Sequence, residues 1–102
     1  MRYKHFTNAD VMVSELGLGS WGNGGADAQG NNFFGDFSEE DCLKAMDVLI
    51  GEGVNLMDTA PAYGWGNSEK LVGKGIKGRR EKVLISTKCG LLRNEQGECV
   101  NE

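Results

Sequence analysis

Two segments with the hydrophobic period of an amphipathic helix alternate with short apolar runs between residues 38 and 87. The first begins at Ser38, a good N-cap residue, and is ended by Gly51 and Gly53. The second begins at Asn67 or Ser68 and ends near Gly78. The predicted inner-face residues are Cys42, Ala45, Met46, Leu49 and Ile50 in the first helix and Leu71, Val72 and Ile76 in the second.

The runs 54–57 and 83–87 are short and apolar, which is typical of strands in a parallel sheet. Strands that alternate with helices predict βαβ units, and right-handed crossovers place both helices on one face of the sheet. The sequence therefore predicts an α/β fold. Two architectures remain open at this point, the start of a (β/α)₈ barrel and half of an open doubly wound sheet.

The flanking segments complete the predicted order. Residues 2–6 and 11–16 indicate two short strands around a turn at 8–10, and a further strand is predicted at 16–19. Residues 21–37 form a polar, glycine-rich loop without a helical period, and 91–102 are expected to be irregular. The order is hairpin, strand, helix, strand, helix, strand.

Composition limits the possible partners. The chain has 102 residues and a net charge of −4, which argues against a nucleic-acid or anionic-membrane surface. A basic cluster at 74–82 is interpreted as a solvated helix end, with an anion contact as the alternative. No window approaches the roughly 18 apolar residues of a membrane span, and no apolar run follows Met1 as a signal peptide would require. We therefore expect a cytoplasmic protein.

Three cysteines, Cys42, Cys89 and Cys99, are spread along the chain without a C-x-x-C element. An odd number of unpaired thiols is typical of a reducing compartment. We expect no metal site, although a zinc site built from the three cysteines and His5 stays possible in principle.

The segment from Gly17 to Gly22 matches the G-x-G-x-x-G pattern of dinucleotide-binding folds and follows a predicted strand. That motif needs a helix to begin inside it, so that a pyrophosphate meets the helix N-terminus. No helix is predicted before Ser38. The glycines are better interpreted as allowing a strand and its loop to pass close to a flat ligand or neighbour, with a dinucleotide fingerprint as the alternative.

Three side chains that carry chemistry are predicted to share one edge of the sheet. Asp58 directly follows the run 54–57, Lys88 directly follows 83–87, and Tyr63 lies in the loop after Asp58. Carboxyl ends of adjacent parallel strands lie side by side, so the carboxylate and the ammonium are expected to meet.

An Asp–Lys pair beside a tyrosine has a definite chemical use. A free phenol titrates near pH 10, which is too high for efficient proton donation at neutral pH, and a neighbouring ammonium lowers the pKa of a phenol. Such a tyrosine can protonate a carbonyl oxygen while a hydride reaches the carbonyl carbon. From the spacing alone, the alternative is a structural ion pair with an exposed loop tyrosine.

Four segments in order resemble the aldo/keto reductase family. Residues 14–21 are similar to its opening strand, and 53–64 resemble its Gly-x-x-x-x-Asp-Thr-Ala-x-x-Tyr-Gly segment. Residues 67–73 resemble the following helix, and 85–88 resemble the strand that carries its lysine. Together these matches cover about residues 2–92.

The resemblance implies a (β/α)₈ barrel closed at its base by an N-terminal hairpin. Residues 1–102 would then be a partial barrel that contains the hairpin and the first β/α units. The implied cofactor is NADP(H) or NAD(H), bound without a Rossmann domain. It would meet the chain at Gly19, Ser20 and Trp21, and Asp58 would also meet its ribose.

The resemblance further implies a catalytic tetrad whose Asp, Tyr and Lys fall on Asp58, Tyr63 and Lys88. The implied function is NAD(P)H-dependent reduction of small aldehydes or ketones to alcohols. The family's tetrad histidine has no counterpart here, because the one histidine, His5, lies in the predicted hairpin.

An N-terminal fragment of such a barrel is expected to be inactive alone and to self-associate through its open edge. The alternative functions are a non-catalytic, reductase-like binding or regulatory module, and a stand-alone binding module.

Overall fold

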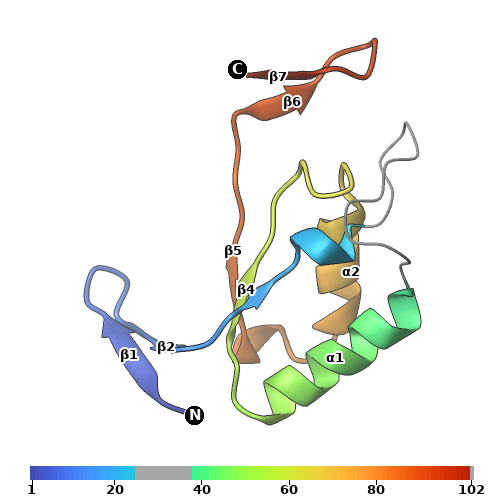
Figure 1. The fold of residues 1–102 in the computed structure, drawn as a ribbon. Helices are drawn as coiled ribbons and strands as arrows, with labels where there is room; N and C mark the ends of the chain where they lie inside the picture. Colours follow the sequence, from blue (N-terminus) through green and yellow to red (C-terminus); the bar gives the residue numbers. More distant parts are fainter. Residues whose placement is uncertain (25–37, 102) are drawn as a thin grey trace.

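The computed structural model describes residues 1–24 and 38–101. At its centre lies a parallel sheet of three strands in the order β3 (Leu18–Gly19), β4 (Leu56–Asp58) and β5 (Leu84–Ser86). Helix α1 (Glu39–Gly51) precedes β4, and α2 (Asn67–Gly75) connects β4 to β5. Both helices lie on the same side of the sheet (Figure 1). The predicted alternation of strands and helices is confirmed.

The strand boundaries differ from the prediction. We predicted a strand at 54–57, but β4 begins two residues later and includes Asp58 as its last residue. The predicted strand 83–87 is shortened to β5 at both ends. Val54 is nevertheless buried, so the apolar run marks the core and extends beyond the hydrogen-bonded ladder.

The hydrophobic core lies between the sheet and the two helices. Its buried members are Met46, Val54, Met57, Val72, Ile76 and Val83. Met57 is fully buried and alternates along β4 with Leu56 and Asp58, which therefore face the opposite side of the sheet. The predicted inner face of the second helix is confirmed, since Leu71, Val72 and Ile76 are all buried. Ala45 was wrongly placed inside and is exposed.

The two helices begin differently. Ser38 caps α1 as predicted, and its hydroxyl accepts a hydrogen bond from the backbone amide of Asp41 at 3.3 Å. The predicted side-chain cap of α2 is wrong, because Gly66 holds the N-cap position with φ 100° and no side chain caps that end. Ser68 lies inside the first turn instead and is fully buried.

Ion pairs connect α2 and the turn after it to α1. Lys74 binds Glu39, and Arg79 binds Asp47 while also donating to the carbonyl of Gly75. The basic cluster therefore includes helix-pairing residues. A 3₁₀ turn at Arg80–Lys82 leads into β5.

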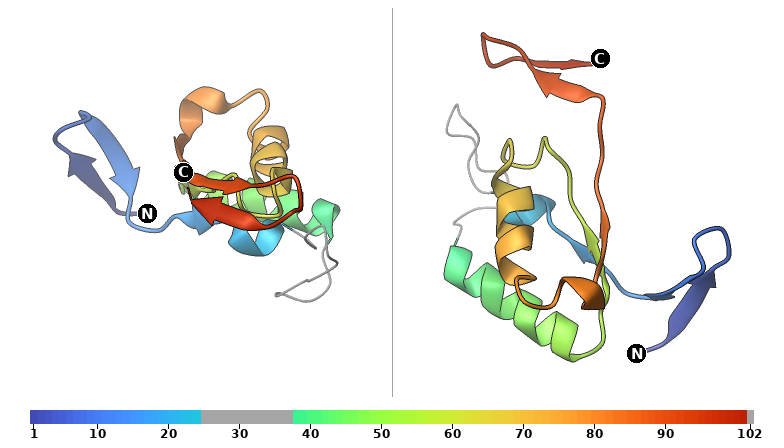
Figure 2. Two further views of the ribbon diagram at one scale, coloured as in Figure 1. Left: turned by 90° about the horizontal axis from the view of Figure 1, so that it is seen from above. Right: turned by 180° about the vertical axis from the view of Figure 1, so that it is seen from behind.

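The predicted N-terminal hairpin is confirmed. Strands β1 (Tyr3–Phe6) and β2 (Val11–Ser14) pair antiparallel and extend away from the sheet (Figure 2). Asn55 fastens this hairpin to the chain just before β4. Its Oδ1 accepts from the Ser14 amide at 2.8 Å, and its Nδ2 donates to the Met12 carbonyl at 2.8 Å.

Asn55→Asp is expected to lower the free energy of unfolding by about 1–3 kcal/mol, because the new carboxylate cannot donate to the Met12 carbonyl and places charge beside it. Denaturant unfolding of the whole protein measures this. Asn8→Asp, the same change at an exposed turn position, is the control and should stay within about 0.5 kcal/mol. Equal losses for the two variants would contradict the fastening role.

The expectation of an irregular segment after residue 91 is wrong. Strands β6 (Leu91–Arg93) and β7 (Cys99–Asn101) form a second antiparallel hairpin beyond the carboxyl edge of the sheet (Figure 1). Gly97 turns the chain with φ 82°. The Arg93 guanidinium lies 5.1 Å from the centre of the Trp65 ring, which links this hairpin to the loop after β4.

The loop after β3 opens with a 3₁₀ turn at Trp21–Asn23, and the rest of the predicted glycine-rich loop, 25–37, lies outside the described residues. Three residues of 3₁₀ turn are not the helix that a dinucleotide fingerprint requires. In the described part of the chain, no helix has both the length and the apolar character needed to cross a membrane.

Candidate active site

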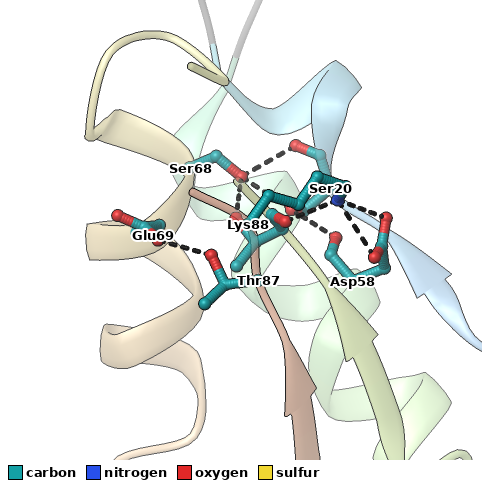
Figure 3. A network of polar contacts seen from close by, with 7 residues as sticks. Ser20, Asp58, Ser68, Glu69, Thr87 and Lys88 are labelled. Carbon is teal, nitrogen blue, oxygen red and sulfur yellow. Dashed lines mark hydrogen bonds and ion pairs between the residues drawn. The ribbon is translucent and has the colours of Figure 1, made fainter. Parts of the chain in front are cut away.

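The predicted meeting of carboxylate and ammonium is confirmed. Asp58 ends β4, and Lys88 follows β5, its neighbour in the sheet. The Lys88 Nζ lies 3.1 Å from Oδ1 and 3.2 Å from Oδ2 of Asp58. It also donates to the backbone carbonyl of Thr59 at 2.7 Å. Figure 3 shows Lys88 reaching over the strand end to Asp58. The ammonium is thus held by three oxygens.

Tyr63 lies beside this pair. The Lys88 Nζ is 4.9 Å from the centre of the Tyr63 ring, within cation–π range. Tyr63 also stacks with Trp21 at a centroid distance of 6.2 Å and an interplanar angle of 27°. The Lys88 and Asp58 side chains are 46% and 43% exposed, so a ligand can reach them.

The environment keeps Lys88 charged. Loss of hydration lowers the pKa of its ammonium, but hydrogen bonding to Tyr63 and Asp58 and the negative charge of Asp58 raise that pKa by more in total. The net pKa lies above the ordinary lysine value. Lys88 is therefore an ammonium throughout the neutral range and a permanent positive charge next to the phenol.

The loop that carries Tyr63 is fixed by left-handed backbone. Gly64, Trp65 and Gly66 have φ of 62°, 49° and 100°. At Gly64 the backbone passes so close to Gly24 that an added Cβ would lie 2.1 Å from the Gly24 carbonyl oxygen. This contact locks the Tyr63 loop against the loop after β3. Glycine in the Tyr-Gly pair is a steric requirement of the site.

Buried hydroxyls lie beneath the site. Ser20, Thr59 and Ser68 are 0%, 2% and 0% exposed, and the Ser68 hydroxyl is hydrogen-bonded to the hydroxyls of both other residues. Figure 3 shows the contact between Ser68 and Ser20. Sequence reasoning missed Thr59 and Ser68 as members of the site. Ser68 has a residue type typical of helix caps, which hides its buried role, and Thr59 belongs to the Asp-Thr-Ala part of the family segment, a signal that assigns it no role of its own.

Ser20 departs from the prediction of a direct cofactor contact. Its amide and its hydroxyl both donate to the Asp58 carbonyl, at 2.9 and 2.8 Å, and its own carbonyl accepts from Ser68. With all its polar groups engaged and no exposed surface, Ser20 supports the site from below.

The remaining predicted contacts fit a flat cofactor. A Cβ added to Gly19 would meet nothing within 4 Å, so the strand end is open to a close approach. Trp21 is 57% exposed and offers a ring face, and the half-exposed Asp58 carboxylate can accept from ribose hydroxyls. A pocket of about 160 Å³ adjoins Tyr63 and Lys88. Its other lining residues are Ala60, Pro61, Ala62, Cys89 and Leu91.

One cysteine, Cys89, lines this pocket, whereas Cys42 lies in α1 and Cys99 in β7. None of the three forms a disulfide bond. Burial raises the pKa of the Cys42 thiol, and Asp41 and Glu39 raise it further, so this thiol stays protonated at neutral pH. Among residues 1–24 and 38–101, no group of three or more His, Cys, Asp or Glu side chains is arranged to hold a metal ion.

The sequence model of the Aldo/keto reductase family matches residues 15–101, which include Asp58, Tyr63 and Lys88. The chain belongs to the aldo/keto reductase family. The resemblance seen in the four sequence segments is therefore confirmed.

Several reductases of this family are similar to the chain over most of its length. The NADH-specific methylglyoxal reductase of Escherichia coli is 38% identical over 91% of this chain and 28% of the relative. Aldo-keto reductase YhdN of Bacillus subtilis is 37% identical over 89% of this chain and 26% of the relative. The chain thus spans about a quarter of the length of the curated relatives that it matches.

Solved structures show the same likeness. An aldo-keto reductase from Bacillus halodurans in its holo form has a TM-score of 0.75 at 34% identity, over 96% of this chain and 28% of that one. An aldo-keto reductase from Klebsiella pneumoniae in complex with NADPH has a TM-score of 0.67 at 29% identity, over 87% of this chain and 28% of that one.

Proposed function

We propose that the whole protein reduces aldehydes or ketones to alcohols with NADP(H) or NAD(H). One observation carries this proposal: the Lys88 ammonium is held by Asp58 and lies 4.9 Å from the Tyr63 ring at the open edge of the sheet. A structural ion pair alone would not need a tyrosine beside it, fixed by a locked loop.

Each of the three side chains has a role in the proposed reaction. Tyr63 donates its phenolic proton to the carbonyl oxygen of the substrate. Lys88 stabilises the phenolate that remains, and Asp58 keeps Lys88 charged and directed toward the phenol. A reduced nicotinamide, when bound, supplies the hydride for the carbonyl carbon. The pocket beside Tyr63 would take a small carbonyl compound.

The cofactor would lie across the carboxyl edge of the sheet. Gly19 provides the open backbone, Trp21 a ring face, and Asp58 an acceptor for ribose hydroxyls. The choice between the two nicotinamide cofactors is left to experiment, since one relative is an NADH-specific reductase and another was solved with NADPH. Three cysteines without a disulfide favour a reducing compartment, and we propose that the activity is cytoplasmic.

We also propose that residues 1–102 form the base hairpin and the first β/α units of a (β/α)₈ barrel. Leu56, Leu84 and Ser86 are partly or fully exposed on the sheet face opposite the helices. In a closed barrel this face is covered by side chains from further strands. The much greater length of the relatives supports the same reading.

The decisive test is NAD(P)H oxidation by the whole protein with a panel of small aldehydes and ketones. Turnover with at least one carbonyl compound is the expected result. Tight cofactor binding without turnover of any panel member would instead favour a non-catalytic binding or regulatory module.

Residues 1–102 produced alone are expected to self-associate and to reduce no carbonyl at a measurable rate. The outer edges of β3 and β5 have no strand partner among the described residues, and an unpaired edge invites pairing with another chain. Analytical ultracentrifugation and an NAD(P)H oxidation assay measure the two outcomes. A monomer with a sharp thermal transition would contradict the first, and turnover would contradict the second.

A further inference from the structure

Ser68 occupies an unusual position for a residue in the first turn of a helix. Its side chain does not cap α2, and it is fully buried. The Ser68 Oγ lies 2.9 Å from the Ser20 carbonyl, 2.7 Å from the Ser20 hydroxyl and 3.0 Å from the Thr59 hydroxyl. It therefore joins the start of α2 to the ends of β3 and β4.

The proton of each hydroxyl can be followed through these contacts. The Ser20 hydroxyl donates to the Asp58 carbonyl at 2.8 Å, so the Ser20 Oγ is an acceptor toward Ser68. The Ser68 hydroxyl has one proton, and it donates this proton either to the carbonyl or to the hydroxyl oxygen of Ser20. Toward Thr59, Ser68 is therefore the acceptor, and the Thr59 hydroxyl is the donor. The chain runs in one direction, from Thr59 through Ser68 and Ser20 to Asp58.

Both residues at the ends of this chain hold Lys88. The Thr59 carbonyl accepts from the Lys88 Nζ at 2.7 Å, and the Asp58 carboxylate accepts from it at 3.1 Å. The adjacent Glu69 accepts from the hydroxyl of Thr87 at 2.7 Å, and Thr87 directly precedes Lys88. The first turn of α2 thus contacts both of the segments that set the position of the ammonium (Figure 3).

We propose that Ser68 is a positioning residue for the carbonyl reduction, acting through Thr59 and Ser20 to hold Lys88 and Asp58 in place beside Tyr63. This inference rests on the proposed function. All buried side-chain nitrogen and oxygen atoms among the described residues have hydrogen-bond partners. Loss of the Ser68 hydroxyl would remove a hydrogen-bond partner from the Thr59 hydroxyl and from the Ser20 carbonyl. Because Lys88 is bound to the Thr59 carbonyl, a shift of Thr59 would also shift Lys88.

The test compares Ser68→Ala with Ser14→Ala in the whole protein. Ser14 is the matched control, because it is also buried and its hydroxyl is also hydrogen-bonded, in this case to the backbone of Leu16 and Asn55 in the hairpin region. We expect Ser68→Ala to lower kcat about tenfold with the KM values for carbonyl and cofactor nearly unchanged. Ser14→Ala should keep the original kcat, and both variants should lose similar thermal stability.

Two further measurements keep the inference falsifiable. Thr59→Val removes the first donor of the chain without changing the side-chain shape, and it should also lower kcat. This variant replaces Ser68→Ala in the test if Ser68→Ala fails to fold. The titration of the Lys88 ammonium, followed by NMR, needs no turnover. Its pKa should stay raised in Ser14→Ala and fall toward the ordinary lysine value in Ser68→Ala.

The outcomes separate the two proposals. A wild-type protein that turns over no carbonyl overturns the proposed function, while the Lys88 titration still decides the role of Ser68. Equal kcat values and equal Lys88 titrations in Ser68→Ala and Ser14→Ala would overturn the positioning role and leave the proposed function intact.

Discussion

Replacing Tyr63 with phenylalanine is expected to lower the kcat of the whole protein about 10²–10⁴-fold, the usual contribution of a positioned acid or base. The phenylalanine ring can still stack with Trp21 and lie under Lys88, so the loop should keep its place. The hydroxyl that donates the proton is lost, together with its hydrogen bonding to Lys88. Initial rates of NAD(P)H oxidation at saturating carbonyl measure the change.

Tyr3→Phe is the matched control for this prediction. The Tyr3 hydroxyl donates to the Gly53 carbonyl at 2.7 Å, far from the sheet edge that holds Tyr63. Its loss is expected to cost about 1 kcal/mol of stability and to leave kcat unchanged. A Tyr63→Phe variant as active as Tyr3→Phe would rule out Tyr63 as the proton donor.

Gly64→Ala is expected to lower the free energy of unfolding by at least about 3 kcal/mol. A left-handed φ of 62° costs an alanine about 1–2 kcal/mol. In addition, the new Cβ would lie 2.1 Å from the Gly24 carbonyl oxygen, so one of the two backbones must move. Because Tyr63 is adjacent, the movement should also reduce carbonyl turnover. Chemical denaturation of the whole protein measures the stability loss.

Gly78→Ala isolates the cost of the steric overlap. Gly78 has φ 83°, yet a Cβ there would meet nothing within 4 Å. This control should lose only the cost of the backbone conformation, about 1–2 kcal/mol. Stability losses of equal size in Gly64→Ala and Gly78→Ala would show that the Gly24 contact can relax freely.

The order of elements was predictable because periodicity and glycine placement are local signals. Ser38, the apolar stripe through Met46 and the run ending at Met57 each indicate their element without reference to the rest of the chain. The meeting of Asp58 and Lys88 followed from topology, since carboxyl ends of adjacent parallel strands lie together.

What could not be predicted depends on contacts between distant segments. Serine is a common helix-capping residue, which predicts a cap at Ser68. In the structure the left-handed turn at 64–66 places Gly66 at the N-cap position, and Ser68 instead contacts Ser20, which follows β3. The second hairpin could not be recognised from its strands, because β6 and β7 are only three residues long each and show no alternation of polar and apolar residues. The signal for this hairpin in the sequence is its turn, from Asn94 to Gly97, rather than either strand.

The chain-order arrangement of β3, β4 and β5 has a consequence for synthesis on the ribosome. No later strand must insert between two earlier ones, so β3 and β4 can pair before β5 is made. Lys88 is 30 residues behind Asp58, a delay of roughly 1.5–6 s at ordinary translation rates. Helices and loops close within microseconds. The hydrogen bonds that join Ser20, Thr59 and Ser68 thus need no residue that is made after Ser68, whereas the Asp58–Lys88 pair must wait for Lys88.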